Sequence, residues 1–300
     1  MKPFSSILTL GGIIWLILAA SGRGAEAPVQ AETDLVKSRS QLHFQTGEVM
    51  LPGGLAKLKL PDTFQYLAPA DAEVVLTQLW GNPPGRKTLG MIFPTGMSPA
   101  SKGTWGIVIT YSDDGYIKDS DADSINYDKL LKSMQEAAKA ANAERSKRGF
   151  PAVELVGWAA HPRYDKAAHK LYWAKELKFS DAEANTLNYS IRALGRAGVL
   201  NLNVVAPMEA LPRVEERAPE IVGLVHFTEG NRYADFNKST DKVAAYGLAA
   251  LVAGGIAAKA GLFKVILAAL LAAKKFVIIG IIAVVAMIKK LLGGQSSASD

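Results

Sequence analysis

The sequence predicts an α+β fold, with a largely antiparallel sheet and two or three helices, followed by a C-terminal transmembrane helical hairpin. Three observations carry this prediction. Several short segments alternate apolar and polar residues, one long segment has an apolar stripe at helical spacing, and the last part of the chain is almost free of charge.

The expected strands are short, show period-two alternation and lie between Gly, Pro, Asn or Asp residues. In one of them Trp105, Ile107, Ile109 and Tyr111 share a face. In the segment 169–179, Leu171 and Trp173 alternate with charged neighbours, the pattern of an antiparallel sheet with one solvated side. The strand-like segments are 56–60, 88–93, 104–111, 153–158, 169–179, 185–194, 199–205 and 223–227.

The clearest helix spans residues 127–148, and Gly149 is a natural stop for it. Its apolar stripe consists of Leu130, Leu131, Met134, Ala138 and Ala141. Two further helices are expected at 71–79 and 207–220.

The basic charge of the chain belongs to its tail. The formal net charge is +6, and residues 243–294 hold six lysines and no acidic residue, which leaves zero for the rest. A nucleic-acid-binding face needs Lys and Arg gathered on the folded domain, so no nucleic acid partner is expected. The absence of cysteine excludes a disulfide, a thiol nucleophile and a Cys-ligated zinc.

Residues 1–27 have the pattern of a signal peptide: Lys2, an apolar run at 7–20, then small residues. An uncleaved anchor helix is the alternative, and both send the following residues across a membrane. We expect a flexible lead-in at 28–45 and an extracytoplasmic α+β domain at 46–242.

Residues 243–292 are expected to anchor the chain to the membrane, before a polar tail at 293–300. The hairpin would use helices at about 243–263 and 276–288, with lysines near their ends reaching the headgroups. The competing arrangement is one span plus a basic amphipathic segment in the interface.

Small residues recur at every fourth position of the first apolar helix, at Ala249, Ala253, Ala257 and Gly261. Such rows let helix backbones approach closely in lipid. They predict helix packing in the membrane, either between chains or within the hairpin of one chain.

Catalytic motifs are scarce. The sequence has no G-x-S-x-G elbow, H-E-x-x-H, Walker loop or G-x-G-x-x-G, and its four histidines lack metal-ligand spacing. Asp119, Asp121 and Asp123 match the first calcium-loop ligands, but Ser124 replaces the required glycine and Leu130 replaces the bidentate Glu. We therefore expect no metal, no cofactor and no catalytic residue.

Two segments nevertheless combine residues suited to binding: the acidic loop 113–123 and the aromatic stretch 158–165, which we expect to be a loop. Two arginines beside Gly195 could hold an anion or form ion pairs at a sheet edge. The candidate binding surface is Asp114, Asp119, Asp121, Asp123, Trp158, His161, Tyr164, Asp165, Arg192 and Arg196. The competing interpretation gives these residues roles in helix capping, turns and packing.

Several motifs resemble a family of bacterial membrane-anchored proteins, domain of unknown function (DUF) 2167. They include Leu51-Pro52-Gly53-Gly54, Trp80-Gly81-Asn82-Pro83-Pro84, Asp114-Gly115-Tyr116, Leu171-Tyr172-Trp173, Leu187-Asn188-Tyr189 with Arg192, and Tyr233-Ala234-Asp235-Phe236. The resemblance implies a secreted domain with a C-terminal anchor. It implies no activity and no functional residues.

These observations favour a noncatalytic protein of the bacterial inner membrane, whose soluble domain faces the periplasm and has a binding or envelope-support role. Its expected partners are membrane lipid and an envelope protein, or further copies of itself through the tail. One alternative is a membrane-tethered hydrolase using loop 113–123 with His161. The other is a membrane-active oligomer formed through the tail.

Overall fold

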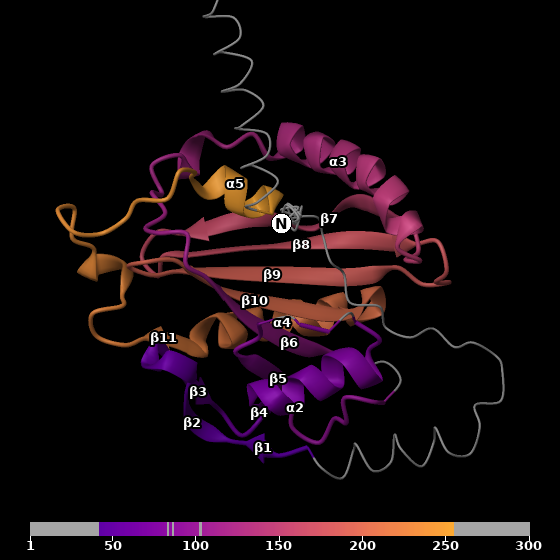
Figure 1. Ribbon diagram of the computed structural model, residues 1–300, viewed down its shortest axis with the longest axis horizontal. Coiled ribbons are helices and arrows are strands. Elements are labelled where there is room, and N and C mark those ends of the chain that lie inside the picture. The colour runs from indigo at the N-terminus through magenta and orange to yellow at the C-terminus, as the bar shows by residue number, and fades with distance from the viewer. Residues whose placement is uncertain (1–41, 83, 86, 102–103, 255–300) are drawn as a thin grey trace, which may run out of the picture.

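The computed structural model describes residues 42–82, 84–85, 87–101 and 104–254 (Figure 1). The predicted signal peptide at 1–27, the lead-in up to residue 41, the second apolar helix at 276–288 and the polar tail at 293–300 lie outside the described residues. So do Ala257 and Gly261 of the small-residue row.

An eight-stranded sheet, antiparallel throughout, forms the centre of the domain, with strand order β1-β4-β5-β6-β10-β9-β8-β7. Its strands are β1 (Phe44–Gln45), β4 (Phe64–Leu67), β5 (Gly90–Pro94), β6 (Gly106–Ser112), β7 (Val153–Asp165), β8 (Lys170–Phe179), β9 (Thr186–Leu194) and β10 (Val199–Pro207). A smaller sheet of β2 (Gly47–Met50), β3 (Ala56–Leu60) and β11 (Val225–Phe227) has the order β11-β3-β2. The predicted α+β class with an antiparallel sheet is confirmed.

Four α-helices accompany the sheets within the described residues: α2 (Pro69–Val74), α3 (Tyr127–Lys147), α4 (Leu211–Gly223) and α5 (Leu248–Ala253). The helix predicted at 127–148 is confirmed as α3, and the side chain of Asn126 caps it by accepting the backbone N–H of Lys129 at 2.8 Å. A π-helical turn at Val75–Leu79 extends α2.

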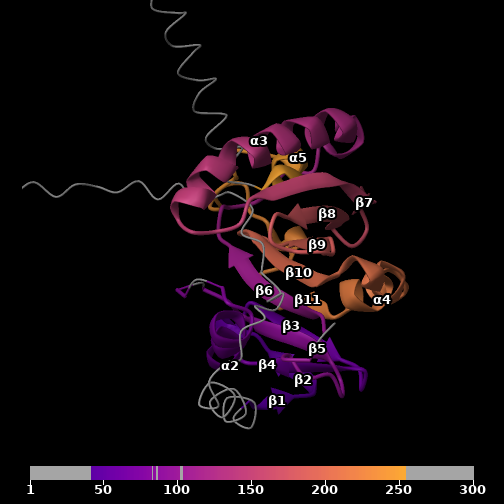
Figure 2. The same cartoon turned by 90° about the vertical axis from the view of Figure 1, so that its right-hand side faces the viewer.

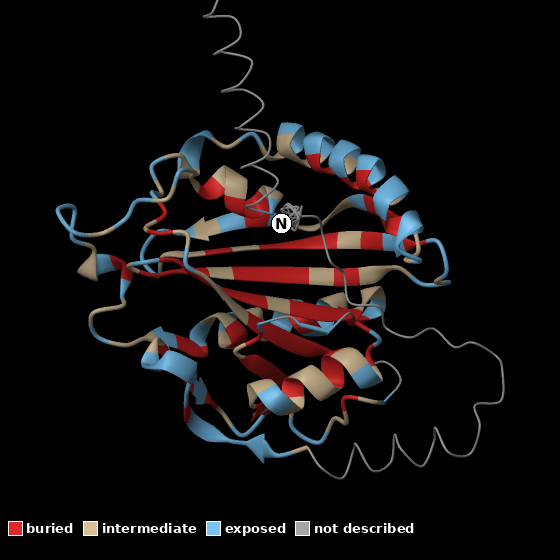
Figure 3. Ribbon diagram, viewed as in Figure 1, coloured by how far each residue is buried: buried red, intermediate tan, exposed pale blue. Residues whose placement is uncertain are grey.

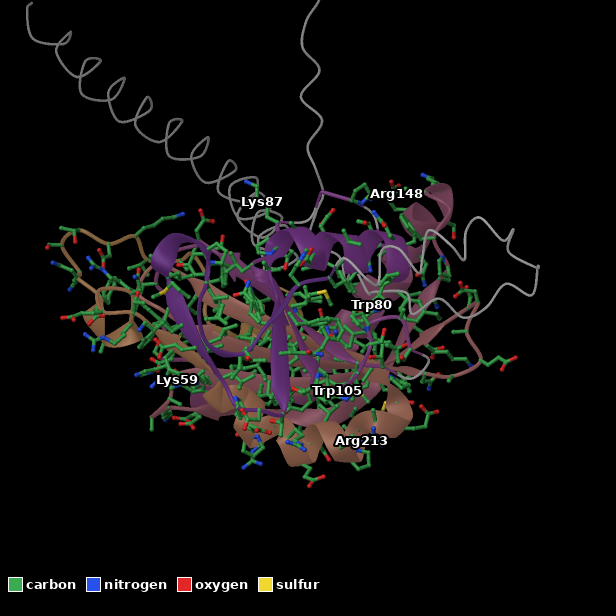
Figure 4. All side chains as sticks on the ribbon, turned by 90° about the horizontal axis from the view of Figure 1, so that it is seen from below. Lys59, Trp80, Lys87, Trp105, Arg148 and Arg213 are labelled. Carbon is green, nitrogen blue, oxygen red and sulfur yellow. The ribbon has the colours of Figure 1, made fainter. Side chains whose placement is uncertain are left out.

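The large sheet is covered on both faces (Figures 1 and 2). On one face α3 and α5 cover β7 and β8, while α2 covers the strands at the other end of the sheet. On the opposite face lie α4 and the small sheet, and their buried residues form one cluster with those of the central strands. The burial map in Figure 3 accordingly shows strands that are mostly buried and helices with one exposed side. In Figure 4 the labelled Trp80 and Trp105 lie inside the fold, and Lys59 and Arg213 lie at its edge.

The segment 158–165 is not a loop. It is the second half of β7, a thirteen-residue edge strand whose pairing with β8 shifts register between Leu155 and Arg163. Bulges of this kind interrupt the alternation of side chains, so the apolar and polar residues no longer follow a period of two. The irregular pattern is therefore typical of a loop, although the backbone is extended and paired.

The start of the predicted first apolar helix also differs. The sequence predicts a helix from Val243, but Val243 forms a parallel bridge with Tyr116, and α5 covers only Leu248–Ala253. Leu248, Leu251 and Val252 are buried in the cluster under α3, and Gly254 ends the helix with a φ of 102°. The folded domain thus extends past the predicted boundary at residue 242, because these apolar side chains find a protein surface to cover them.

Across the described ranges, we find no helix with both the length and the apolar character needed to cross a membrane.

Candidate functional site

The acidic loop 113–123 fastens the segment that precedes the tail. Asp121 accepts the backbone N–H groups of Leu248 and Ala249 at 3.0 and 3.1 Å, which caps the start of α5. Tyr246 donates its hydroxyl to Asp114. The backbone adds two bonds, from Tyr116 N–H to Lys242 O and from Ala244 N–H to Tyr116 O. Two candidate binding residues, Asp114 and Asp121, thus act within the fold.

Asp119 belongs to an aromatic cluster beside the junction between loop 113–123 and residues 242–249. The hydroxyl of Tyr164 donates to Asp119 at 2.7 Å and lies 3.3 Å from Nδ1 of His169. Burial, followed by the hydrogen bond to Asp119, raises the pKa of Tyr164 far above its usual value. His169 packs on Tyr233, and Tyr116 stacks between Tyr233 and Phe236. The neutral tyrosine and the carboxylate therefore hold the loop against the turn between β7 and β8.

The remaining acidic candidates lie near that turn. Asp123 pairs with Lys166 at 2.6 Å, with both side chains mostly exposed. Asp165 accepts the N–H groups of Ala167 and Ala168 at 2.9 Å, which stabilises the turn. His161 is exposed on β7, and the histidine that neighbours Asp119 is His169, whose Nδ1 lies 3.8 Å from the carboxylate. The histidine that contacts loop 113–123 is therefore His169 and not the predicted His161.

No three His, Asp or Glu side chains within the described residues gather in a way that could hold a metal ion.

Arg196 forms an ion pair with Asp241 on the segment that leads to α5. Its Nε and Nη2 donate to the two carboxylate oxygens at 2.7 and 2.9 Å. This bidentate pair, together with the backbone N–H of Asn237 and the hydroxyl of Thr240 as further donors, holds the pKa of Asp241 far below its usual value. Arg196 is thus one more tie between the sheet and residues 237–253 rather than a free anion site.

The other arginine has a different setting. Arg192 lies on β9 with Nη1 donating to Ile191 O and Nη2 to the amide oxygen of Asn203, both at 3.0 Å. Its guanidinium lies over the ring of Trp173, 5.0 Å from the centroid. Neither acceptor is charged, and burial lowers the pKa of Arg192 to about 10.

Lys175, on the neighbouring β8, is 8% exposed. Burial, and then the charge of Arg192, lowers its pKa to about 8. The two cations belong to a set of polar residues on one face of the central strands. We call this set the polar strip: Lys175, Asn188, Ser190, Arg192, Asn201 and Asn203.

Of the polar strip, only Arg192 was predicted from the sequence as a binding residue. Leu171, Trp173 and Leu177 lie on the same face of β8 as Lys175, because they are spaced two residues apart. The lysine therefore occupies an inward position of a clear strand pattern. A lysine at an inward position could have indicated a buried polar site. Which residues surround this lysine depends on the pairing of the neighbouring strands, which the sequence does not show.

The structure therefore defines an α+β domain with an antiparallel sheet covered on both faces. Residues 242–253 dock onto this domain, and the polar strip lies on its central strands. The chain belongs to the family described as "Protein of unknown function (DUF2167)", whose family model matches residues 43–285. No curated protein matches. Among solved structures, cyanobacterial PsbP (CyanoP) from Synechocystis sp. PCC 6803 is similar at 9% identity and a TM-score of 0.33, covering 62% of this chain and 92% of that chain.

Proposed function

We propose that this chain is a noncatalytic envelope protein, anchored in a bacterial inner membrane, whose α+β domain faces the periplasm and binds a partner there. The observation that carries the proposal is the docking of residues 242–253 onto the domain by loop 113–123. The apolar residues from 255 onward follow directly. A domain bound this closely to the residue before its anchor is held near the bilayer surface rather than on a long linker.

The same docking bears on the form of the anchor. Two spans need about 40 residues, and residues 255–292 supply slightly fewer once 243–253 belong to the domain. This supports the arrangement with one span and a basic amphipathic segment in the interface over the hairpin. Ala249 and Ala253 then lie on α5, outside the membrane, so the small-residue row no longer forms one helix face in lipid.

The contacts support a binding role over hydrolysis. Asp114, Asp119 and Asp121 bond to a tyrosine, another tyrosine and a helix N-terminus, respectively. A hydrolase would need one of these carboxylates beside a base and open to a substrate. Asp119 has His169 at 3.8 Å, but its carboxylate accepts the hydroxyl of Tyr164. We therefore favour a structural role for the loop, in place of the catalytic role considered from the sequence.

Protease added to intact spheroplasts tests the orientation. We expect the full-length domain to be digested, while a cytoplasmic marker stays intact until detergent is added. Full protection of the domain would contradict the periplasmic placement. A matched chain ending after Gly254 should be exported and leave the membrane in alkaline carbonate, whereas the full-length chain should stay.

Crosslinking in intact cells, followed by mass spectrometry, tests the binding role. A specific partner linked to the described domain would support it. Self-crosslinks alone, lost in the chain ending after Gly254, would instead support the membrane-active oligomer.

A further inference from the structure

We propose that the polar strip is a binding site for a phosphate group, with Lys175 and Arg192 as its cationic ligands. The proposal deepens the proposed binding role by naming the chemistry of the ligand. It rests on contacts within the domain and not on the anchor. The phosphate site can therefore be wrong while the membrane anchoring is right, and the anchoring can be wrong while the site is right.

The first step is a pair of buried cations that have no carboxylate partner among the described residues. Lys175 and Arg192 are close enough for the charge of one to lower the pKa of the other. In the part of the chain that the structure describes, neither forms an ion pair with a carboxylate, and the acceptors of Arg192 are the neutral Ile191 O and Asn203 Oδ1. Removing a cation from water without an anionic partner is costly. Buried cations without an anionic partner are common at functional sites, because a bound ligand there supplies the negative charge.

The second step is that these side chains share one face of three adjacent strands. Strand pairing places Lys175 opposite Asn188, and Arg192 opposite Asn201. Ser190 lies between Trp173 of β8 and Asn203 of β10, and its hydroxyl lies 3.4 Å from the amide oxygens of Asn188 and Asn203. The strip therefore spans three hydrogen-bonded strands in the interior of the sheet. In Figure 1, β9 and β10 run between β7 and β8, which α3 and α5 cover, and the strands that α2 covers.

The third step is a pair of orphan donors beside the cations. The indole N–H groups of Trp158 and Trp173 are buried and have no hydrogen-bond partner within the described residues. Trp158 is opposite Lys175 in the sheet, and Trp173 packs under Arg192. Indole N–H groups donate only, so an acceptor is what both lack. Buried donors of this kind normally have a partner, and a bound ligand supplies one.

The identity of the ligand follows from charge and geometry. Two cations call for two negative charges, which a phosphate group carries and a single carboxylate does not. Its several acceptor oxygens also suit donors that approach from β7, β8 and β9. The group can come from a soluble phosphate compound or from the headgroup of an anionic lipid.

The test uses the full-length chain in phosphatidylcholine nanodiscs, with the unfolding midpoint and calorimetry as readouts. Inorganic phosphate should raise the midpoint and bind, while acetate and chloride at equal ionic strength should not. Nanodiscs containing phosphatidic acid, without added phosphate, test the lipid source. A response in either arm supports the site and names its source, and no response in both overturns it. An equal response to acetate would overturn the choice of phosphate.

Lys175→Met is the decisive variant, and Lys178→Met, exposed on the same strand, is its matched control. We expect Lys175→Met to lose at least about tenfold in phosphate affinity and to unfold, without ligand, at the same or a higher midpoint than the wild type. Lys178→Met should change neither. A Lys175→Met protein that is destabilised yet binds phosphate like the control would show that the lysine serves packing alone.

Trp158→Phe provides a second test that keeps an aromatic ring in place and removes one orphan donor. Its phosphate affinity should fall severalfold with little change in the ligand-free midpoint. Unchanged affinity in both Trp158→Phe and Lys175→Met would overturn the proposal.

Discussion

Asp121 accepts a hydrogen bond from the backbone N–H of Leu248 at 3.0 Å, across 127 residues of chain. Its second oxygen accepts the N–H of Ala249 at 3.1 Å. The residue before α5 is Gly247, which has no side chain to cap the helix, and a Cβ there would lie 2.7 Å from the Asp121 carboxylate. A helix of six residues is unstable by itself. The distant carboxylate and the burial of Leu248, Leu251 and Val252 therefore make α5 a helix.

Asp121→Ala should loosen α5. Two backbone N–H groups would lose their acceptor, and the free energy of unfolding should fall by about 1–2 kcal/mol. Hydrogen exchange at Leu248 and Ala249 should become faster than in the wild type, which mass spectrometry of the corresponding peptides measures.

Asp123→Ala is the control from the same loop. Asp123 pairs with Lys166 where the two side chains are 83% and 62% exposed, and such exposed pairs contribute little to stability because water and salt screen them. Exchange in α5 should not change. Equal acceleration in both variants would show that general loosening of the loop, not the cap, explains the effect.

Gly115→Ala should disturb the same junction through its backbone. Gly115 has a φ of 105°, and a Cβ would lie 2.6 Å from the carbonyl oxygen of Lys242. Strain and clash together should cost more than about 2 kcal/mol in urea unfolding. Gly149→Ala is the control, since Gly149 also has positive φ, at 75°, but nothing within 4 Å of the added atom. A similar loss in both would contradict the close approach of Lys242.

The sequence could predict the strands and α3 because their patterns depend on local geometry. Trp105, Ile107 and Ile109 are buried on one face of the sheet, as their period-two spacing predicts, and Val108 is buried on the other face. Val243–Ala253 could not be assigned in this way, because an apolar helix packed on protein and one packed in lipid have the same composition. The contacts that decide between them come from Tyr116 and Asp121, more than a hundred residues earlier.

The candidate site was predictable only in part. The acidic loop was predicted as part of a binding surface, but Asp114, Asp119 and Asp121 bind the protein's own backbone N–H groups and hydroxyls. These partners lie on segments whose position depends on the tertiary fold. Lys175 was missed although Arg192 was not, because the pairing of β8 with β9 is what brings them together. The orphan N–H groups of Trp158 and Trp173 are likewise properties of packing rather than of sequence.

The ion pair of Arg196 with Asp241 should make the junction sensitive to acid. The hydrogen bonds from Arg196 lower the pKa of Asp241 in the folded protein, so the unfolded chain takes up the proton first. The pair therefore contributes fully to stability above the unfolded pKa of about 4, and that contribution is lost as the pH falls below it. Asp241→Asn should be less stable than the wild type at pH 7, and the difference should shrink toward pH 2 in urea titrations. A difference that stays constant with pH would contradict this role.

Lys175 should also make the stability rise with pH, but over an alkaline range. Its pKa falls to about 8 in the folded protein because of burial, from 10.5 for a lysine side chain in water. Between these values the unfolded chain binds the proton and the folded one does not, so the free energy of unfolding rises with pH. The gain is at most about 3 kcal/mol. Buried tyrosines also titrate above about pH 10, so the comparison is wild type against Lys175→Met, which shares them.

That comparison between pH 7 and pH 10 separates two accounts of the polar strip. If no anion neutralises Lys175 in the ligand-free protein, the wild type should gain stability relative to Lys175→Met as the pH rises. Phosphate affinity should fall over the same range, because the neutral amine no longer pairs with the anion. If an anionic segment of the same chain already neutralises Lys175, its folded pKa stays near 10.5, and both the gain and the fall in affinity are absent. Parallel stability curves for the two proteins would thus exclude an open cationic site on the central strands.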